Sequence, residues 1–222
     1  MNMQPIFITG IGTNVGKTIV SAIVTEALHA NYWKPIQAGF EDGTDALQIG
    51  NLISNTATAI FPEVYKLQMP ASPHIAARTE QLQINLNHII NQQPQTSNSK
   101  LVIEGAGGIL VPLNDQEFII DLIEQLQAKA ILVSRNYLGS INHSLLTAAI
   151  CKQRNIDVLG WIFNDTYLDY EDEIVQWTGY PKIASIPFAK CINKTFILQQ
   201  ANEIRLSLQQ LIYDKASTQK NI

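Results

Sequence analysis

The sequence has little charge. Only 15% of its 222 residues are Asp, Glu, Lys or Arg, against about 25% in an average soluble domain. Neutral amides take their place, since Asn and Gln together number 36. A chain that is 46% hydrophobic with so little charge is not a disordered one. Its formal charge of −4, without any Lys/Arg run, argues against duplex nucleic acid or an anionic membrane as the main partner.

Cysteines and long apolar runs are also scarce. Cys151 and Cys191 are too few for a disulfide framework or a thiolate metal site, so both are expected to be small buried hydrophobic residues. No apolar run approaches the ~18 residues of a membrane span. Residues 1–4 carry no basic side chain, unlike the start of a signal peptide. We therefore expect a cytoplasmic protein.

Short β-branched runs alternate with longer helical patterns along the whole chain. Most of the runs are apolar on both faces, as in strands covered by helices on each side of a parallel sheet. The expected strands are Ile6–Ile8, Tyr32–Ile36, Leu101–Ile103, Ala130–Val133, Val158–Phe163 and Lys182–Ile186. The expected helices are Lys17–Ala30, Asp45–Ile53, Asn85–Gln92, Phe118–Gln127, Asn142–Gln153 and Thr195–Leu211. This alternation predicts an α/β protein with a doubly wound, mostly parallel sheet flanked by helices. We expect one domain over residues 1–222, with a frayed tail at about 215–222.

The strongest motif is the segment GIGTNVGKT at residues 10–18, between a predicted strand and a predicted helix. Its three glycines let backbone N–H groups approach anionic oxygens at a helix N-terminus. Lys17 has the reach for β- and γ-phosphates, and the Thr18 hydroxyl suits Mg²⁺. Five residues separate Gly10 from the Gly-Lys pair, where the common phosphate-loop pattern has four. The position between strand and helix nevertheless favours a nucleotide-binding loop over a simple glycine turn.

Charged side chains also stand at or near the ends of other predicted strands, where ligands bind in open α/β sheets. Lys34 directly precedes Pro35, which holds it extended, and a catalytic role is favoured over that of an ordinary exposed lysine. Glu104 ends a buried strand, and a buried carboxylate needs a partner or a metal. Beside Thr18 it is a candidate Mg²⁺ ligand. Asp45 is either a third ligand or an ordinary helix-start residue.

The pair Asn164-Asp165 follows a further predicted strand. A side-chain amide donates to and accepts from a purine edge, so Asn164 is a candidate base reader. The chain lacks an Asn-Lys-x-Asp pattern, which favours adenine over guanine. A turn-forming Asn-Asp pair is the alternative. No two of the four histidines have metal-ligand spacing and no G-x-S-x-G motif occurs, so zinc and serine-hydrolase chemistry lack support.

Eight motifs, in order along nearly the whole chain, resemble the dethiobiotin synthetase family of ATP-dependent enzymes, which have a P-loop NTPase fold. The motifs are Thr13–Thr18, Lys34–Gly39, Asp45, Pro70–His74, Glu104–Gly108, Leu138–His143, Gly160–Asp165 and Ile186–Phe188. Each motif alone is modest evidence, but eight motifs in the same order are highly specific to the family. The resemblance implies a homodimer that uses ATP and Mg²⁺ to convert 7,8-diaminononanoate and CO₂ into dethiobiotin. The implied reaction passes through a carbamate and its mixed anhydride with phosphate.

The resemblance also implies the site residues. Lys34 and Lys17 would be catalytic, and Thr18, Asp45 and Glu104 would hold Mg²⁺. The nucleotide would contact Gly12, Thr13, Asn14, Val15, Gly16, Lys17, Thr18, Ile19, Asp45, Glu104, Gly105, Ala106, Gly107, Asn164, Asp165, Pro187 and Phe188. The diamine would contact Lys34, Ala38, Ser72 and Pro73 from one subunit. Its carboxylate would bind at a helix start of the other subunit, formed by Gly139, Ser140, Ile141 and Asn142.

Two positions depart from the family pattern. Asn14 stands where many members carry an acidic residue, which removes any charge-based role there. Ala38 stands where others often have Ser or Thr, so a hydroxyl that would contact the diamine or its carbamate is missing. We expect weaker substrate binding with turnover retained. An Ala38→Ser variant should therefore have a lower KM for the diamine, and an unchanged or higher KM would contradict this hypothesis.

Two other functions occur in chains with similar motifs. Partitioning ATPases act as nucleotide-dependent switches and usually carry an extra lysine near the loop start, where this chain has Gly10, Ile11 and Gly12. Amidase-type synthetases of cobalamin metabolism normally append a glutaminase domain, for which 222 residues leave no room. The synthetase is therefore favoured, with the switch ATPase as the alternative.

Overall fold

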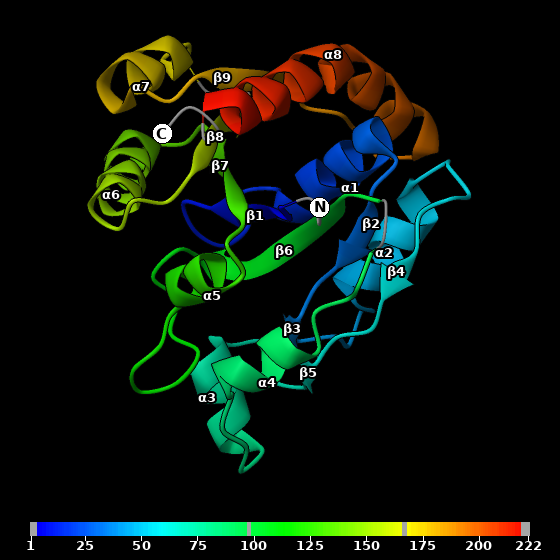
Figure 1. Cartoon of the computed structure of the whole chain (residues 1–222), viewed down its shortest axis with the longest axis vertical. Coiled ribbons are helices and arrows are strands. Elements are labelled where there is room, and N and C mark those ends of the chain that lie inside the picture. Colours follow the sequence, from blue (N-terminus) through cyan, green and yellow to red (C-terminus); the bar gives the residue numbers. More distant parts are fainter. Residues whose placement is uncertain (1–3, 97–98, 166–167, 219–222) are drawn as a thin grey trace.

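The computed structural model describes residues 4–96, 99–165 and 168–218. Its central feature is a seven-stranded sheet in the order β4-β2-β6-β1-β7-β8-β9, in which every neighbouring pair is parallel (Figure 1). These strands are β1 (Ile6–Gly10), β2 (Asn31–Trp33), β4 (Ile60–Phe61), β6 (Leu101–Gly108), β7 (Lys129–Arg135), β8 (Val158–Asn164) and β9 (Lys182–Ile186). The predicted fold class, a parallel sheet flanked by helices, is confirmed.

Helices cover both faces of this sheet. They are α1 (Lys17–Leu28), α2 (Asp45–Leu52), α3 (Pro73–Thr79), α4 (Leu86–Asn91), α5 (Ile119–Gln125), α6 (Ser140–Gln153), α7 (Glu171–Thr178) and α8 (Lys194–Thr218). Helices α1, α2 and α8 share one apolar core with the sheet, and α3 to α7 share the other. Side chains along β1 alternate between the two cores, with Ile6 and Ile8 in the first core and Phe7 in the second.

The connections change direction at β1. The chain runs from β1 to β2 and β4 on one side, returns to β6 beside β1, and continues through β7, β8 and β9 on the other side. Helix α1, which follows β1, lies on one face, whereas α5, which follows β6, lies on the opposite face. Ligands in sheets of this kind bind in the crevice between the carboxyl ends of two such strands. The topology therefore places a binding crevice beyond Gly10 and Gly108.

The main difference from the sequence prediction lies after β2. The run Tyr32–Ile36, predicted as one strand, is interrupted at Lys34-Pro35, because proline has no N–H for a strand ladder. The chain resumes as β3 (Ile36–Ala38), which pairs in parallel with β5 (Tyr65–Leu67) in a separate two-stranded sheet. Strands β4 and β5 and helices α3 and α7 are absent from the prediction, because none carries a long periodic pattern.

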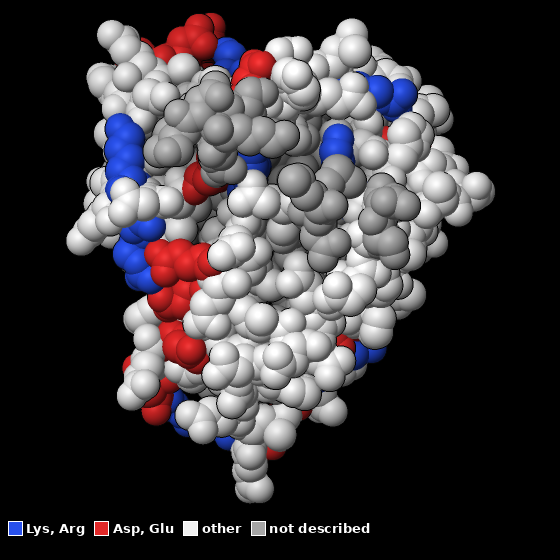
Figure 2. Space-filling model, in the orientation of Figure 1, with Lys and Arg blue, Asp and Glu red and all other residues white. Residues whose placement is uncertain are grey.

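Smaller points concern the C-terminal helix, the cysteines and the surface. Helix α8 continues to Thr218, into the stretch predicted as a frayed tail, and residues 219–222 lie outside the described part. Cys151 is buried as expected, but Cys191 is exposed, so that expectation is wrong for it. No helix in the described ranges is long and apolar enough to cross a membrane. The face shown in Figure 2 is mostly uncharged, in keeping with the low charge of the sequence.

Candidate active site

The phosphate loop, residues 11–16, connects β1 to α1 at the edge of the crevice. Gly16 ends it with a φ of 90°, and Asn14 also has a positive φ, of 59°. A Cβ at Gly16 would lie 2.5 Å from the Asn164 Nδ2 atom. Glycine is therefore required there by the backbone conformation and by the close contact. The Asn164 amide in turn donates to the Val15 carbonyl at 2.6 Å, which ties the loop to the end of β8.

Lys17, the first residue of α1, bends back over this loop. Its Nζ donates to the Gly12 carbonyl at 2.9 Å, and its side chain is buried. Burial lowers the pKa of Lys17 from 10.5 to about 8. The Glu104 and Asp45 carboxylates oppose this shift, and Lys34 adds to it. Lys17 lacks a direct carboxylate partner in the hydrogen bonds and ion pairs of the described residues. It is therefore available to a bound anion, which would favour its charged form.

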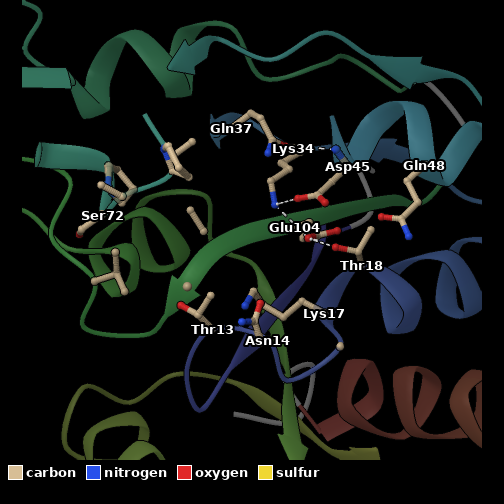
Figure 3. Close-up of a pocket in the computed structure, with 18 of the residues that line it drawn as sticks. Thr13, Asn14, Lys17, Thr18, Lys34, Gln37, Asp45, Gln48, Ser72 and Glu104 are labelled. Atoms are coloured by element: carbon tan, nitrogen blue, oxygen red, sulfur yellow. Dashed lines mark hydrogen bonds and ion pairs between the residues drawn. The ribbon is translucent and has the colours of Figure 1, made fainter. Parts of the chain in front are cut away.

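Three charged side chains from different elements meet beside the loop (Figure 3). Lys34 follows β2, Glu104 lies in β6, and Asp45 is the first residue of α2. The Lys34 Nζ lies 2.9 Å from Glu104 Oε1 and 2.5 Å from Asp45 Oδ2. The Thr18 hydroxyl donates to the same Glu104 oxygen at 2.9 Å, although the two residues are 86 positions apart. The fold thus brings together side chains that the sequence analysis selected separately.

The charge of Lys34 is fixed by these neighbours. Burial alone lowers the pKa of a lysine, but the Glu104 and Asp45 carboxylates outweigh it and raise the pKa of Lys34 above its usual 10.5. The group therefore stays an ammonium ion at neutral pH. Such a preorganised cation beside a phosphate loop stabilises developing negative charge and does not act as a base.

The oxygen atoms of this cluster fit a magnesium ion. Mg²⁺ takes hard oxygen ligands at about 2.1 Å in octahedral geometry, which puts neighbouring ligand atoms about 3 Å apart. The Thr18 and Glu104 oxygens are 2.9 Å apart, and Asp45 shares the Lys34 ammonium with Glu104. Within the described ranges, no group of three or more His, Cys, Asp and Glu side chains could hold a metal. A metal here would therefore rely on the Thr18 hydroxyl and on substrate oxygens besides the two carboxylates.

Two buried side chains that support the cluster are missing from the sequence prediction. The Tyr32 hydroxyl donates to Glu104 Oε2 at 2.8 Å. The Gln37 side chain donates to the Gly39 carbonyl at 2.7 Å and accepts from the Asp45 N–H at 3.2 Å. Tyr32 stands two positions before Lys34 in an extended segment, and that spacing is the signal that places both on one side. Gln37 has no such signal, because its partners depend on the loop conformation.

The cluster and the phosphate loop line one cavity of about 770 Å³. Of the predicted residues, the cavity is lined by Thr13, Asn14, Gly16, Lys17, Thr18, Ile19, Lys34, Ala38, Asp45, Ser72, Pro73, Glu104, Ala106 and Gly107. The residues that the prediction lacks are Gln37, Gln48, Pro70, Ala71 and Val111. In Figure 3, Ser72 lies across the cavity from Asp45 and Glu104, so the cavity extends well beyond the charged cluster.

The other predicted nucleotide residues lie outside the lining of this cavity. Gly12, Val15 and Gly105 belong to the loop and to β6, next to lining residues. Asn164 ends β8, and the following Asp165 forms an ion pair with Arg135 at 3.1 Å. The last two, Pro187 and Phe188, follow β9 and are exposed. All lie in or after the carboxyl-terminal half of a strand, on the same edge of the sheet as the phosphate loop.

The predicted helix start Gly139–Asn142 also lies apart from the cavity. Gly139 caps α6 in a left-handed conformation, with φ 102°. The Ser140 hydroxyl is buried against the Tyr170 hydroxyl at 2.7 Å, whereas Asn142 is exposed. The structure holds one chain, so the placement of this helix start in a partner subunit stays a prediction.

Comparison with solved structures defines the class of the fold. The MinC:MinD cell division protein complex of Aquifex aeolicus matches with a TM-score of 0.58, at 14% identity over 96% of both chains. A ParA family ATPase of Chlorobium tepidum matches with a TM-score of 0.56, at 13% identity over 90% of this chain and 98% of that one. A family model described as an AAA domain matches residues 4–195. The chain is a P-loop protein of the α/β class.

Sequence relatives narrow this class. An ATP-dependent dethiobiotin synthetase BioD of Cytophaga hutchinsonii is 48% identical over 200 residues, which cover 90% of this chain and 96% of that protein. The protein of the same name from Christiangramia forsetii is 51% identical over 158 residues, which cover 71% and 74%. The chain therefore belongs to the dethiobiotin synthetase family.

Proposed function

We propose that this chain is an ATP-dependent dethiobiotin synthetase, which carboxylates 7,8-diaminononanoate with CO₂ and closes the ureido ring. The observation that carries the proposal is the convergence of two lysines, two carboxylates and a threonine hydroxyl on one cavity at the phosphate loop. Relatives at 48% and 51% identity bear the name of this activity. The cavity of about 770 Å³ has room for the triphosphate group of a nucleotide together with a small diamine.

The reaction needs a site that holds two anionic partners together. One amine of the substrate takes up CO₂ as a carbamate, whose oxygen attacks the γ-phosphorus of ATP and displaces ADP. The second amine attacks the carbonyl carbon of the resulting anhydride, gives up a proton and expels phosphate. Fixed cations and loop amides stabilise the charge that develops in these steps, and positioning supplies much of the rest. The amines are nucleophiles themselves once unprotonated, so the site needs no separate base.

The two lysines divide this work. Lys17 would bind β- and γ-phosphate oxygens, since it lies over the loop and has no carboxylate of its own. Lys34 would bind the carbamate and the γ-phosphate, since two carboxylates hold its ammonium group in the cluster beside the loop. Both are buried cations, so each interaction is stronger than it would be in water.

Thr18, Asp45 and Glu104 would hold Mg²⁺, which neutralises charge on the β- and γ-phosphate oxygens when bound. Their positions in the fold support this proposal. Thr18 lies in the first turn of α1, and Glu104 lies in the buried strand β6. Asp45 begins α2, whose first turn is fixed by the Thr44 side chain accepting the Leu47 N–H at 3.2 Å.

The adenine and the diamine would occupy opposite ends of the site. We propose Asn164, Asp165, Pro187 and Phe188 as the adenine side, because they end or follow β8 and β9, and Asn164 contacts the phosphate loop. Exposed Phe188 offers a surface on which a purine can stack. Ala38, Ser72 and Pro73 would contact the diamine, because they line the cavity beside Lys34.

We also propose the quaternary structure and compartment that the resemblance implies. The chain would be one catalytic domain that forms a homodimer in the cytoplasm, with the substrate carboxylate at the partner's helix start Gly139–Asn142. Helix α6, which begins there, is 14 residues long. Its Ser140 N–H donates to the Tyr137 carbonyl, but the Ile141 and Asn142 N–H groups have no partner among the hydrogen bonds of the described residues, which suits an anion. Exposed Leu138, which precedes this helix, and Leu146 within it suit burial in an interface.

The alternative, a nucleotide-dependent switch, has support from the fold alone. The ParA and MinD structures match at 13% and 14% identity, which shows shared architecture alone. The Lys34–Asp45–Glu104 cluster and the identities to the synthetases favour the enzyme.

The test is a reaction with the purified chain, 7,8-diaminononanoate, bicarbonate, Mg²⁺ and ATP, in which ADP and dethiobiotin are both quantified by mass. We expect equal amounts of the two products, with ADP formation dependent on the diamine. Omission of the diamine and a Glu104→Ala variant serve as controls. ATP consumption without the ureido product would refute the synthetase and support the switch.

A further inference from the structure

The two carboxylate oxygens of Glu104 have different partners. Oε1 accepts from the Thr18 hydroxyl and from the Lys34 ammonium, each at 2.9 Å, and thus faces the phosphate loop. Oε2 accepts from the Tyr32 hydroxyl at 2.8 Å, within the protein interior. Glu104 is only 1% exposed, so its carboxylate depends mainly on these protein donors. The direction of the carboxylate is therefore set by protein donors on both sides.

Tyr32 is itself held in place by the sheet. It lies in β2, paired with Ile60 of β4 on one side and with Val102 of β6 on the other. Val102 and Glu104 are two positions apart in β6, so both side chains lie on the same face of the sheet as Tyr32. The ring is fully buried in the core beneath α1 and α2. The hydroxyl therefore reaches Glu104 from behind, from a ring that has no freedom to move away.

We propose that Tyr32 is a positioning residue for Glu104: by holding Oε2, its hydroxyl turns Oε1 toward Thr18 and the metal. The inference rests on the proposed function, in which Glu104 is a Mg²⁺ ligand. Without the Tyr32 hydroxyl, the buried Oε2 has no donor among the described contacts. The carboxylate then rotates about its last bond to find one, and Oε1 leaves the position next to Thr18. Groups that orient a metal ligand in this way typically change metal affinity by 10- to 100-fold.

The experiment is a titration of Mn²⁺, a paramagnetic substitute for Mg²⁺, followed by EPR with the protein saturated by ADP. The Tyr32→Phe variant keeps the ring and removes only the donor. We expect its Mn²⁺ Kd to rise about tenfold, with the ADP Kd in EDTA unchanged. A variant with 4-aminophenylalanine at position 32, which restores an N–H donor on the same ring, should recover most of the Mn²⁺ affinity.

Two further variants make the outcome decisive. Tyr65→Phe is the matched control, because the Tyr65 hydroxyl is also hydrogen-bonded, accepting the Asn85 N–H at 3.0 Å. It should leave the Mn²⁺ Kd unchanged. Glu104→Ala should abolish the tight Mn²⁺ site, and the addition of Tyr32→Phe to it should change nothing more.

The results distinguish the positioning role of Tyr32 from the metal site itself. If Glu104→Ala weakens Mn²⁺ binding and Tyr32→Phe does not, Tyr32 is only a core residue and the inference fails, while the proposed metal site stands. If Glu104→Ala leaves Mn²⁺ binding unchanged, the proposed metal site fails first. A lower Tm of Tyr32→Phe at an unchanged Mn²⁺ Kd likewise refutes the positioning role.

Discussion

Asp45 Oδ2 lies 2.5 Å from the Lys34 Nζ, and this contact joins the first residue of α2 to the segment after β2. Asp45 and Glu104 place two carboxylates next to the buried Lys34 ammonium, so the charge of Lys34 does not depend on a bound substrate. The same arrangement means that a cation is already present where we propose that the carbamate is activated. The lysine is thus preorganised, which is the main requirement for electrostatic catalysis.

Removal of this ammonium should affect turnover far more than nucleotide binding. We expect Lys34→Ala to lower kcat by at least about 100-fold, since a preorganised charge at the reacting atoms is lost. The ADP Kd should stay within about threefold of wild type, because the phosphate loop and Lys17 are untouched. Steady-state kinetics and calorimetry measure the two quantities. Lys152→Ala, an exposed lysine of α6, is the control, and substantial activity in Lys34→Ala would remove the catalytic assignment.

The lowered pKa of Lys17 makes nucleotide binding depend on pH. In the ligand-free chain this pKa is about 8 because of burial, whereas a bound polyphosphate raises it again. Binding therefore takes up a proton above about pH 8, and affinity falls as the pH rises, by up to about tenfold per unit. Calorimetry of ADP binding in two buffers of different ionisation enthalpy, at about pH 7 and about pH 9, measures this uptake.

The control for this pH dependence is the Lys17→Ala variant. It should bind ADP more weakly, and its residual affinity should lose the proton uptake at the higher pH. An ADP affinity of the wild type that stays constant up to about pH 10, near the ordinary lysine pKa, would contradict the prediction.

The sequence predicts much of this fold because the strands and crossover helices carry clear periodic patterns. It also selects Lys17 from the glycine-rich loop motif, and Lys34 and Glu104 because charged residues at strand ends contrast with the apolar runs before them. The two-residue spacing places Tyr32 on the same side as Lys34, but it does not reveal Tyr32 as a partner of Glu104, because a tyrosine in an apolar strand looks like any core residue. Gln37 is missed for a different reason, since its hydrogen bonds depend on a loop whose path follows from the interruption at Pro35.

Gly16 should tolerate no side chain. Its φ of 90° costs a residue with a Cβ about 1–2 kcal/mol, and the Cβ would also lie 2.5 Å from the Asn164 amide. We expect Gly16→Ala to lose nucleotide binding and to lower the free energy of unfolding by more than that strain alone. Urea unfolding of Gly16→Ala, Asn164→Ala and the double variant separates the two effects. The double variant should lose less free energy of unfolding than the two single variants together, because the clash disappears and only the backbone strain remains. Strict additivity would show that the contact does not matter.

The proposed dimer predicts complementation between two inactive chains. If each site takes Lys34 from one subunit and the helix start from the other, a mixed dimer contains one site with both groups intact. Ile141→Pro removes an N–H from the first turn of α6, where proline is tolerated. Lys34→Ala and Ile141→Pro should each be nearly inactive as homodimers. Refolded together in equal amounts, they should regain about a quarter of wild-type activity, because half of the dimers are mixed and each has one working site of two.

Mixing without joint refolding is the control. If the refolded mixture stays inactive although mass spectrometry finds mixed dimers, the diamine carboxylate does not bind at the partner's helix start.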